Sequence, residues 1–594
     1  MRTKKILILA ILLIAVFETR ANAENPGDDR PNVVIVITDD QGYGDLSCHG
    51  NSVLRTPNLD QLHSVSTRLT DYHVAPTCSP TRAALLTGHW TNRTGVWHTI
   101  MGRSMLRENE VTVGKIFADQ GYATGMFGKW HLGDNYPFRP EDRGFTEVLR
   151  HGGGGVGQTP DYWDNAYFDD TYWHNKVPVK CEGYCTDVFF DYAKRFISTQ
   201  KESGKPFLAY ISTNAPHGPM LCPEQWSAPY MEQGNHVGNF LGMIANIDDN
   251  VGRLREYLEA EGLAENTIFI FTTDNGTSSG HEIFNSAMRG KKGSEYDGGH
   301  RVPFFLHWPA GGYENGVDVD DLTAHVDVIP TLLELCELDS PAEIEFDGMS
   351  IRPLIDGEQE FFDRILVTDS QRVKDPIMWR KSAVMKGKWR LVNGSELYNV
   401  ESDPGQKDNV AESNPEIVNE LRQFYETWWE ELEPTFDQDT LIYIGHDAEN
   451  PARLTSHDWI TTGSSPWNQG HIRRAANGRN VTGHWNVRVA EKGTYEVALR
   501  RWPEPADASI DAPLEPGADV PGGQPPRVVP GVAITPVRVV LQVGELVVEQ
   551  EFEPAAKEVV FTLELEAQDT TLQGTFIEAD GTEYGAYYAY VLRK

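Results

Sequence analysis

The chain has 594 residues, of which 40% are hydrophobic, and its formal net charge is -35. The length predicts several domains and the apolar fraction predicts a sizeable core, so disorder is a poor account of most of the chain. The acidic balance argues against nucleic acid as a partner, because a phosphate backbone is bound by clustered Lys and Arg side chains.

The first 23 residues are predicted to be a secretory signal peptide. Arg2, Lys4 and Lys5 give a basic start, and residues 6–17 form an apolar stretch that is too short to span a bilayer. Small residues at 21–23 stand at the expected cleavage spacing. We therefore expect export to the periplasm or the extracellular space, with a short membrane anchor as the alternative. No later apolar run is long enough for a transmembrane segment.

Three apolar segments, at residues 32–38, 206–212 and 267–273, predict buried parallel strands, because each is a continuous run of β-branched and other large apolar residues. Helical stretches at 187–199 and 240–261 lie between them. This alternation predicts an α/β fold with a mainly parallel central sheet flanked by helices. Each run ends in polar residues, and ligands in such folds lie beyond the carboxyl ends of strands. The three ends therefore predict one shared crevice.

The sequence changes in character after the expected catalytic domain, which we place at residues 32–365. Residues 366–435 contain short strands with Gly-containing turns and then an amphipathic helix, which predicts a small antiparallel-β plus helix subdomain. Residues 440–594 alternate in polarity or are rich in β-branched residues, which predicts an all-β, sandwich-like accessory domain. That domain either binds glycan or packs against the catalytic domain. Trp428 and Trp429, on the amphipathic helix, are expected in the core.

Oxygen-bearing side chains follow two of the predicted strands. Asp39 and Asp40 come directly after the first strand, and Asp274 and Asn275 after the third. Four such side chains at converging strand ends suit a hard cation. Ca²⁺ is favoured over Mg²⁺ because it accepts carboxylate and amide oxygens in irregular geometry. Taken alone, such pairs also occur in turns and helix caps.

Six cysteines do not amount to a disulfide framework in a chain of this length. Cys181 and Cys185 are either bridged or two free thiols. A zinc site formed by these two residues with Cys222 lacks a supporting histidine spacing.

Cys78 begins the segment Cys78-Ser79-Pro80-Thr81-Arg82, which continues as Ala-Ala-Leu-Leu-Thr-Gly. Alone, the cysteine is a structural residue or a nucleophile beside a fixed cation. The whole segment resembles the signature of the type I, arylsulfatase-like sulfatases of the alkaline phosphatase superfamily. In that family the cysteine is oxidised to formylglycine (3-oxoalanine) by a sulfatase-maturing enzyme. Residues 128–133, 215–217 and 289–299 resemble further family segments, except that the family usually has Glu at Asp297.

The resemblance, which covers most of residues 31–433, implies a role for each matching position. The metal ligands would be Asp39, Asp40, Asp274, Asn275 and the converted Cys78. Arg82 and Lys129 would hold the hydrated aldehyde, and His131 would be the base that releases sulfate. The sulfate contacts would be Lys129, His217 and Lys292, with Lys291 as the alternative to Lys292. His217 would also donate a proton to the leaving alcohol.

The sequence thus predicts a secreted, Ca²⁺-dependent hydrolase acting on sulfate esters, with a sulfated polysaccharide or oligosaccharide as the expected substrate. His98 and Arg103 are further candidates for substrate binding, since they follow the helix that carries Cys78. Two alternatives stay open. One is a phosphonate or phosphodiester hydrolase of the same superfamily, and the other is a glycan-binding protein with a decayed catalytic domain.

Overall fold

The computed structural model describes residues 29–358, 363–474, 481–520 and 530–594. The expected signal peptide lies outside these residues. Within the described part of the chain, no helix combines the length and apolar character that crossing a membrane requires.

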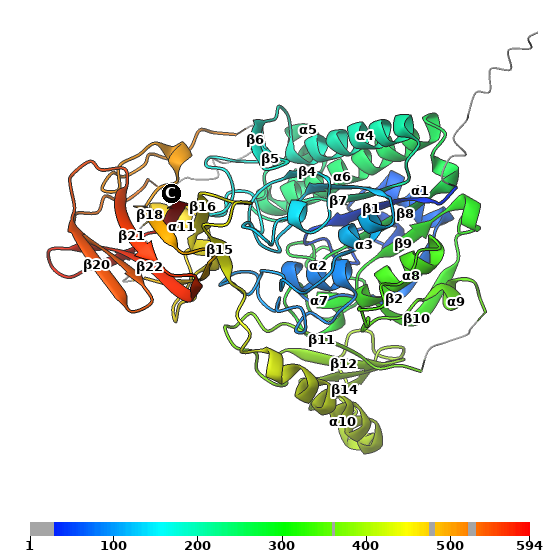
Figure 1. Ribbon diagram of the computed structural model, residues 1–594. Helices are drawn as coiled ribbons and strands as arrows, with labels where there is room; N and C mark the ends of the chain where they lie inside the picture. The colour runs from blue at the N-terminus through cyan, green and yellow to red at the C-terminus, as the bar shows by residue number, and fades with distance from the viewer. Residues whose placement is uncertain (1–28, 359–362, 475–480, 521–529) are drawn as a thin grey trace, which may run out of the picture.

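A ten-stranded sheet forms the centre of the larger unit (Figure 1). Its strands are β1 (Asn32–Thr38), β2 (Thr67–His73), β3 (Ala123–Gly128), β4 (Glu147–Arg150), β5 (Thr171–His174), β6 (Val177–Lys180), β7 (Phe207–Ser212), β8 (Thr267–Thr273), β9 (Phe304–His307) and β10 (Asp318–Ala324). They are ordered β10-β2-β9-β8-β1-β7-β3-β4-β5-β6. The run from β8 to β4 is parallel, which confirms the predicted mainly parallel sheet.

Helices cover both faces of this sheet. The longer ones are α1 (Pro57–Val65), α2 (Cys78–Thr87), α3 (Val113–Asp119), α4 (Cys185–Ser203), α6 (Asn235–Ala260) and α8 (Val328–Leu335). Alternate side chains of β1 explain the two layers. Val33, Ile35 and Ile37 pack in one apolar cluster with α2, α3 and α8, whereas Val34 and Val36 pack in another with α1, α4 and α6. A strand buried on both faces must be apolar throughout, as the predicted run was.

The smaller unit after the catalytic sheet is a four-stranded antiparallel sheet with one helix. The strands are β11 (Leu366–Asp369), β12 (Ser382–Lys386), β13 (Trp389–Val392) and β14 (Glu396–Asn399), and the helix is α10 (Pro415–Leu432). Trp428 and Trp429 are buried, together with Trp90 and Trp97 of the larger unit. The prediction that these two tryptophans are core residues is therefore confirmed.

Two β-sheets make up the C-terminal unit, drawn in yellow, orange and red in Figure 1. One contains β15 (Ile442–Ile444), β17 (Trp485–Val489), β19 (Pro536–Val543), β20 (Leu546–Glu551), β22 (Gln568–Glu578) and β23 (Glu583–Gly585). The other contains β16 (Ala452–Thr455), β18 (Gly493–Arg500), β21 (Val559–Leu565) and β24 (Tyr588–Arg593). Both sheets bury side chains in one core, which also includes Met105, Phe138 and Trp163 of the larger unit. The C-terminal unit thus shares its core with loops of the larger unit.

Candidate active site

The carboxyl ends of β1 and β8 bring four candidate ligands together. The two strands pair in parallel with Thr38 opposite Thr273, so the Asp39-Asp40 and Asp274-Asn275 pairs leave the sheet side by side. The backbone N–H of Asp40 donates to Oδ1 of Asp274 at 3.1 Å, and Nδ2 of Asn275 donates to Oδ1 of Asp40 at 2.9 Å. The structure therefore brings these four side chains together beyond the carboxyl ends of the two strands.

Cys78 is the first residue of α2 and is buried beside these carboxylates. Its Sγ and one carboxylate oxygen from each of Asp39 and Asp274 all lie within 4.8 Å of one another. The N-terminus of a buried helix favours negative charge, because its first N–H groups are not used within the helix. A nucleophilic oxygen anion on residue 78 would therefore be stabilised by α2.

Three cations are paired one to one with the three carboxylates. Lys129 Nζ lies 2.6 Å from Asp39 Oδ2, Arg82 Nη2 lies 2.6 Å from Asp274 Oδ2, and Lys292 Nζ lies 2.5 Å from Asp40 Oδ1. Arg82 also donates to the carbonyl of Lys129 at 3.2 Å and to Oγ of Ser212. The cluster is electrically balanced, so any added divalent cation makes it positive and attractive to an anionic ester inside an acidic protein.

Two buried oxygens fit this site to a hard cation. Oδ1 of Asp39 and Oδ1 of Asn275 have no hydrogen-bond partner among the described residues. An unsatisfied buried acceptor costs about 1–3 kcal/mol, so a cation coordinated by both oxygens would remove that cost. The donor set is otherwise carboxylate oxygen, which Ca²⁺ and Mg²⁺ prefer.

The carboxyl pKa values differ with the balance of burial and charge. Burial raises the pKa of Asp39, and burial together with Asp39 raises the pKa of Asp274 to about 6. Burial would also raise the pKa of Asp40, but Lys292 and His217 outweigh it and hold that pKa below its usual range. A bound cation would favour the ionised form of all three groups.

His131 is held as a neutral base. Its Nε2–H donates to the carbonyl of Thr99 at 2.9 Å, and its Nδ1 is buried without a partner in the described chain. Burial and the charge of Lys129 lower its pKa well below the usual value. The free lone pair on Nδ1 is thus available to accept a proton.

Backbone conformation at the site is strained in a way that sequence could not reveal. Both Asp40 and His131 have left-handed backbones, with φ of 67° and 61°. Such conformations in non-glycine residues persist where the surrounding structure holds them, and they cluster at functional sites. Gly128 has φ of 115°, and a Cβ there would lie 1.9 Å from the Ser212 carbonyl oxygen. Glycine at this position therefore allows the end of β3, just before Lys129, to pack closely against the end of β7.

His217 follows β7 and faces the same cluster. Its Nδ1–H donates to the carbonyl of Gly218 at 2.7 Å, which leaves Nε2 toward Asp40 Oδ2, 3.9 Å away. Burial and Lys292 lower the pKa of His217 to about 3. The structure also separates the two adjacent lysines: Lys292 reaches Asp40, whereas Lys291 is exposed, with Nζ 3.4 Å from Nε2 of His281.

His98 and Arg103 are placed differently. Arg103 is 5% exposed, donates to the Lys374 carbonyl and forms a 2.7 Å ion pair with Asp439, ahead of the C-terminal unit. His98 is buried, and its Nδ1 accepts from the Thr99 N–H at 2.7 Å. Neither residue lines the cavity beside His217 in the part of the chain that the structure describes.

That cavity, of about 370 Å³, is built by two units of the protein. His217, Gly218 and Tyr167 line one side, and Trp467 with residues 468–470 of the C-terminal unit line the other. The contact includes backbone pairing: the Thr159 N–H donates to the Trp467 carbonyl at 2.9 Å, and Gln158 forms a β-bridge with Asn468. Sequence reasoning missed this wall, because residues 467–470 carry no motif.

His457 is a second contribution from the C-terminal unit. Its ring centroid lies 5.8 Å from that of His131, and its carbonyl accepts from the Met101 N–H at 2.8 Å. The side chain is 2% exposed, its Nδ1 lies 3.0 Å from Asp458 Oδ1, and its Nε2 has no partner among described residues. A buried polar atom beside the base is a candidate substrate contact.

A mainly parallel α/β sheet, a nucleophile position at a helix start, a cation cluster and a base together define a hydrolase for anionic esters. The sulfatase family model matches residues 31–338, more than half of the chain, and this protein belongs to that family, in its type I branch. It is a sulfuric ester hydrolase. A second model, described as N-sulphoglucosamine sulphohydrolase, C-terminal, matches residues 291–428.

Individual relatives agree with this assignment. Arylsulfatase A of Homo sapiens is 29% identical over 462 residues, which are 66% of this chain and 86% of that protein. Arylsulfatase G of Mus musculus is 30% identical over 385 residues, or 57% and 71% of the two chains. The crystal structure of Ps i-CgsB in complex with k-i-k-neocarrahexaose is 28% identical, covers 69% of this chain and 95% of that one, and has a TM-score of 0.63. Family members generally depend on a metal ion.

Proposed function

We propose that this sulfatase is exported and hydrolyses sulfate esters of a polysaccharide or oligosaccharide, with formylglycine made from Cys78 as its nucleophile. The observation that carries the proposal is the position of Cys78, within 4.8 Å of the ligand oxygens of Asp39 and Asp274, at the start of α2. Because the cysteine is only a precursor, activity depends on a host that has a formylglycine-generating or sulfatase-maturing enzyme.

Ca²⁺ would be held by Asp39, Asp40, Asp274, Asn275 and an oxygen of the converted residue 78, and when bound it supplies charge that acidifies the attacking hydroxyl. Ca²⁺ suits this proposal better than Mg²⁺ because the donors come from two strand ends and a helix, with no regular octahedral arrangement imposed.

The protein's own groups carry the two displacement steps. One hydroxyl of the hydrated aldehyde loses its proton to solvent and its oxygen attacks sulfur, the bond from sulfur to the alcohol oxygen breaks, and the alcohol leaves with a proton from Nε2 of His217. The bound sulfate would raise the pKa of that ring toward the protonated form that this step needs, since opposite charge favours the charged form. The second hydroxyl then gives its proton to Nδ1 of His131, its oxygen forms the aldehyde, and sulfate leaves. A serine or thiol lacks that second hydroxyl.

Lys129, His217 and Lys292 would bind the sulfate oxygens and offset the charge that develops in the transition state, while Arg82 and Lys129 would hold the hydrated aldehyde. Each of the three cations Arg82, Lys129 and Lys292 pairs with a carboxylate that would also ligate the metal ion, so metal binding would free part of their charge for these contacts.

A carbohydrate substrate is favoured by the cavity beside His217. Its volume of about 370 Å³ exceeds what a sulfate group alone needs and falls in the roughly 300–1,000 Å³ range of small-molecule sites. Trp467 offers an aromatic side chain, and Gln158 and Asn468 offer amides. The neighbour at 28% identity was solved with a neocarrahexaose, which is an oligosaccharide.

Three measurements test this function. The mass of the peptide containing Cys78 from protein matured in a competent host should be lower than that of the thiol form, because an aldehyde replaces the thiol. Sulfate should be released much faster than phosphate from matched aryl esters, and a panel of sulfated oligosaccharides should identify the sugar. An unmodified thiol in active enzyme, or faster phosphate release, would overturn the proposal. A mature N-terminus at Glu24 in the culture medium or periplasm would establish export.

A further inference from the structure

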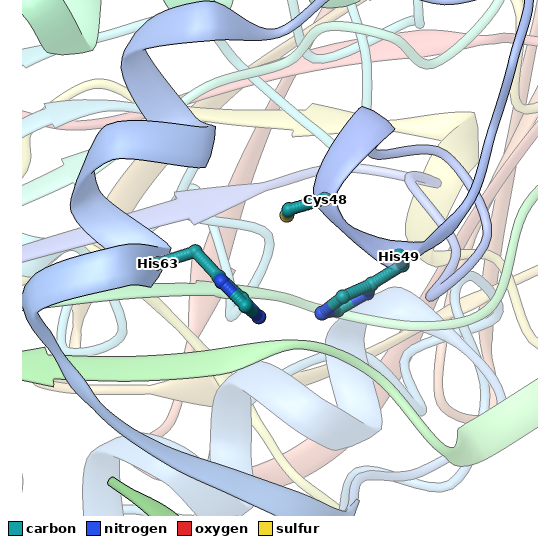
Figure 2. Close-up of side chains that lie close together, drawn as sticks. All are labelled: Cys48, His49 and His63. Atoms are coloured by element: carbon teal, nitrogen blue, oxygen red, sulfur yellow. The ribbon is translucent and has the colours of Figure 1, made fainter. Parts of the chain in front are cut away.

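Cys48, His49 and His63 come together on a part of the molecule that the catalytic reaction does not use (Figure 2). Cys48 and His49 belong to the short helix η1 (Ser47–His49), and His63 is in the last turn of α1. Cys48 Sγ and one ring nitrogen of each histidine all lie within 4.8 Å of one another. In Figure 2 the tips of the two imidazole rings point toward each other, with the cysteine beside the gap.

His49 is oriented as a metal-binding histidine is. Its Nδ1–H donates to the Tyr43 carbonyl at 2.8 Å, which fixes the tautomer and leaves the lone pair of Nε2 free. Tyr43 also stacks on the ring, with centroids 3.9 Å apart and an interplanar angle of 16°. A backbone carbonyl that accepts from the second ring nitrogen is the usual support for an imidazole ligand.

His63 and Cys48 complete the donor set. The His63 ring lies edge-on to His49 and Phe305, with centroids at 5.5 and 5.2 Å, and no hydrogen bond to the described residues engages it. Burial lowers the pKa of His49 to about 4 and also lowers that of His63, so both rings are in the neutral form that binds metal. Burial raises the pKa of the Cys48 thiol, so a metal ion would be needed to deprotonate it.

The surroundings can accept a cation. Arg68 pairs with Asp318, 2.5 Å away, and Arg301 lies 3.8 Å from Asp71, a carboxylate that it shares with Arg390. The three ligands open onto a cavity of about 240 Å³, from which water can reach the site.

A second cluster of potential metal ligands, with two carboxylates in place of a thiol and an imidazole, shows what a closed site looks like. Asp71, His73 and Asp297 also lie within 4.8 Å of one another, but Arg390 fills the space between them. Its Nη2 lies 2.7 Å from Asp71 Oδ1 and its Nε lies 3.4 Å from Asp297 Oδ1. No such cation stands between Cys48, His49 and His63 among the described residues.

We propose that Cys48, His49 and His63 bind one Zn²⁺, with a water molecule as the fourth ligand. Thiolate and imidazole ligands favour zinc, whereas the oxygen ligands of the active site favour a hard cation. The two sites would therefore bind different ions because their ligands differ. Zinc would tie η1 to α1 and so brace the segment that follows the catalytic Asp39 and Asp40. This site is independent of the proposed sulfatase substrate.

The test uses the mature chain carrying Cys78→Ala and saturated with Ca²⁺. Under these conditions neither the active-site thiol nor the active-site carboxylates can bind the added Co²⁺ or Zn²⁺. Co²⁺ serves as the spectroscopic probe for zinc. One equivalent should give a thiolate-to-cobalt charge-transfer band, which one equivalent of Zn²⁺ abolishes, and metal analysis after desalting should find about one zinc per chain.

Two variants and one control decide the outcome. Cys48→Ser should lose the band, and His63→Gln should weaken Zn²⁺ binding at least tenfold. Cys181→Ser removes a different buried cysteine and should leave both unchanged. The absence of a band in the parent, or a band that survives Cys48→Ser, would overturn the proposal. If Cys48→Ser fails to fold, an unchanged Zn²⁺ affinity in His63→Gln would also overturn the proposal.

Discussion

The backbone of Gly154 lies directly against the imidazole of His131. A Cβ atom at position 154 would fall 2.0 Å from Cε1 and 2.3 Å from Nε2 of the ring, distances at which one group must move. The ring cannot tilt away freely, because its Nε2–H donates to the Thr99 carbonyl and its own φ of 61° is fixed by the fold. We therefore expect glycine at position 154 to be required because it leaves room for the His131 ring, and not because it makes the loop flexible.

Gly154→Ala should lower kcat at least tenfold while the protein stays folded, because the methyl group displaces the base from the sulfated intermediate. A small displacement of a positioned group is enough for such a loss. Steady-state kinetics with an aryl sulfate, together with the melting temperature, measure both quantities. Gly463→Ala is the matched control, since the nearest atom to its Cβ is 3.8 Å away. Normal kcat in Gly154→Ala would show that the ring has room to move.

Asn275→Ala should weaken Ca²⁺ binding, since it removes one of the two unsatisfied buried oxygens of the site. Added Ca²⁺ should raise the Tm of chelator-treated protein, and the shift should be smaller in the variant. A tenfold loss of affinity corresponds to about 1.4 kcal/mol of ligand-dependent stabilisation. Asn250→Ala, at a buried asparagine bonded to Asp187, should keep the full shift. Equal shifts in both variants would remove Asn275 from the ligand set.

Much of this site could be predicted from sequence because parallel strands impose it. The apolar runs of β1 and β8 locate two strand ends. Because Thr38 lies opposite Thr273 in parallel strands, the polar residues that follow them leave the sheet side by side. Lys292 was favoured over Lys291 by motif spacing, and its contact with Asp40 agrees.

The C-terminal contribution was beyond sequence reasoning. His457 contacts a residue more than 300 positions earlier, and residues 467–470 line the cavity from a loop. Neither has a periodic or motif signal, because their positions depend on how the C-terminal sheets pack against Met105, Phe138 and Trp163. The same limit applied to Arg103, whose partner Asp439 lies far along the chain.

Four buried histidines should each contribute a loss of stability as the pH falls below about 6.5. Burial is the main cause that lowers the pKa values of His98, His151, His300 and His325 to about 3 in the folded protein. The unfolded chain, with histidine pKa near 6.5, binds more protons in the interval from about 6.5 to 3, so stability falls as the pH drops. Each group contributes up to about 1.4 kcal/mol per pH unit there.

His325→Gln should flatten this acid dependence, because neither ring nitrogen of His325 has a partner in the described chain and the side chain is 2% exposed. Denaturation midpoints between pH 7.5 and 4.5 give the slope for each protein. The exposed His236, changed to Gln, is the control and should leave the slope unchanged. A slope in His325→Gln equal to that of the parent would contradict the assignment.

His457→Ala and Trp467→Ala should separate large substrates from small ones. Both side chains come from the C-terminal unit: Trp467 lines the cavity and the ring of His457 lies beside that of His131. The proposed sulfate contacts, Lys129, His217 and Lys292, all belong to the larger unit. The kcat/KM for a sulfated oligosaccharide should therefore fall at least tenfold, or about 1.4 kcal/mol of transition-state stabilisation, while that for a small aryl sulfate changes little.

The aryl sulfate serves as the internal control for folding and maturation in both variants. Trp428→Phe is a matched control at a tryptophan of the α10 core, and should affect the two substrates equally. An equal loss on both substrates in His457→Ala would instead mean that the residue positions His131, whose ring it neighbours, and does not contact the sugar. Unchanged kinetics in Trp467→Ala would place the sugar outside the cavity. The two outcomes thus assign the C-terminal unit either to recognition of the substrate or to support of the base.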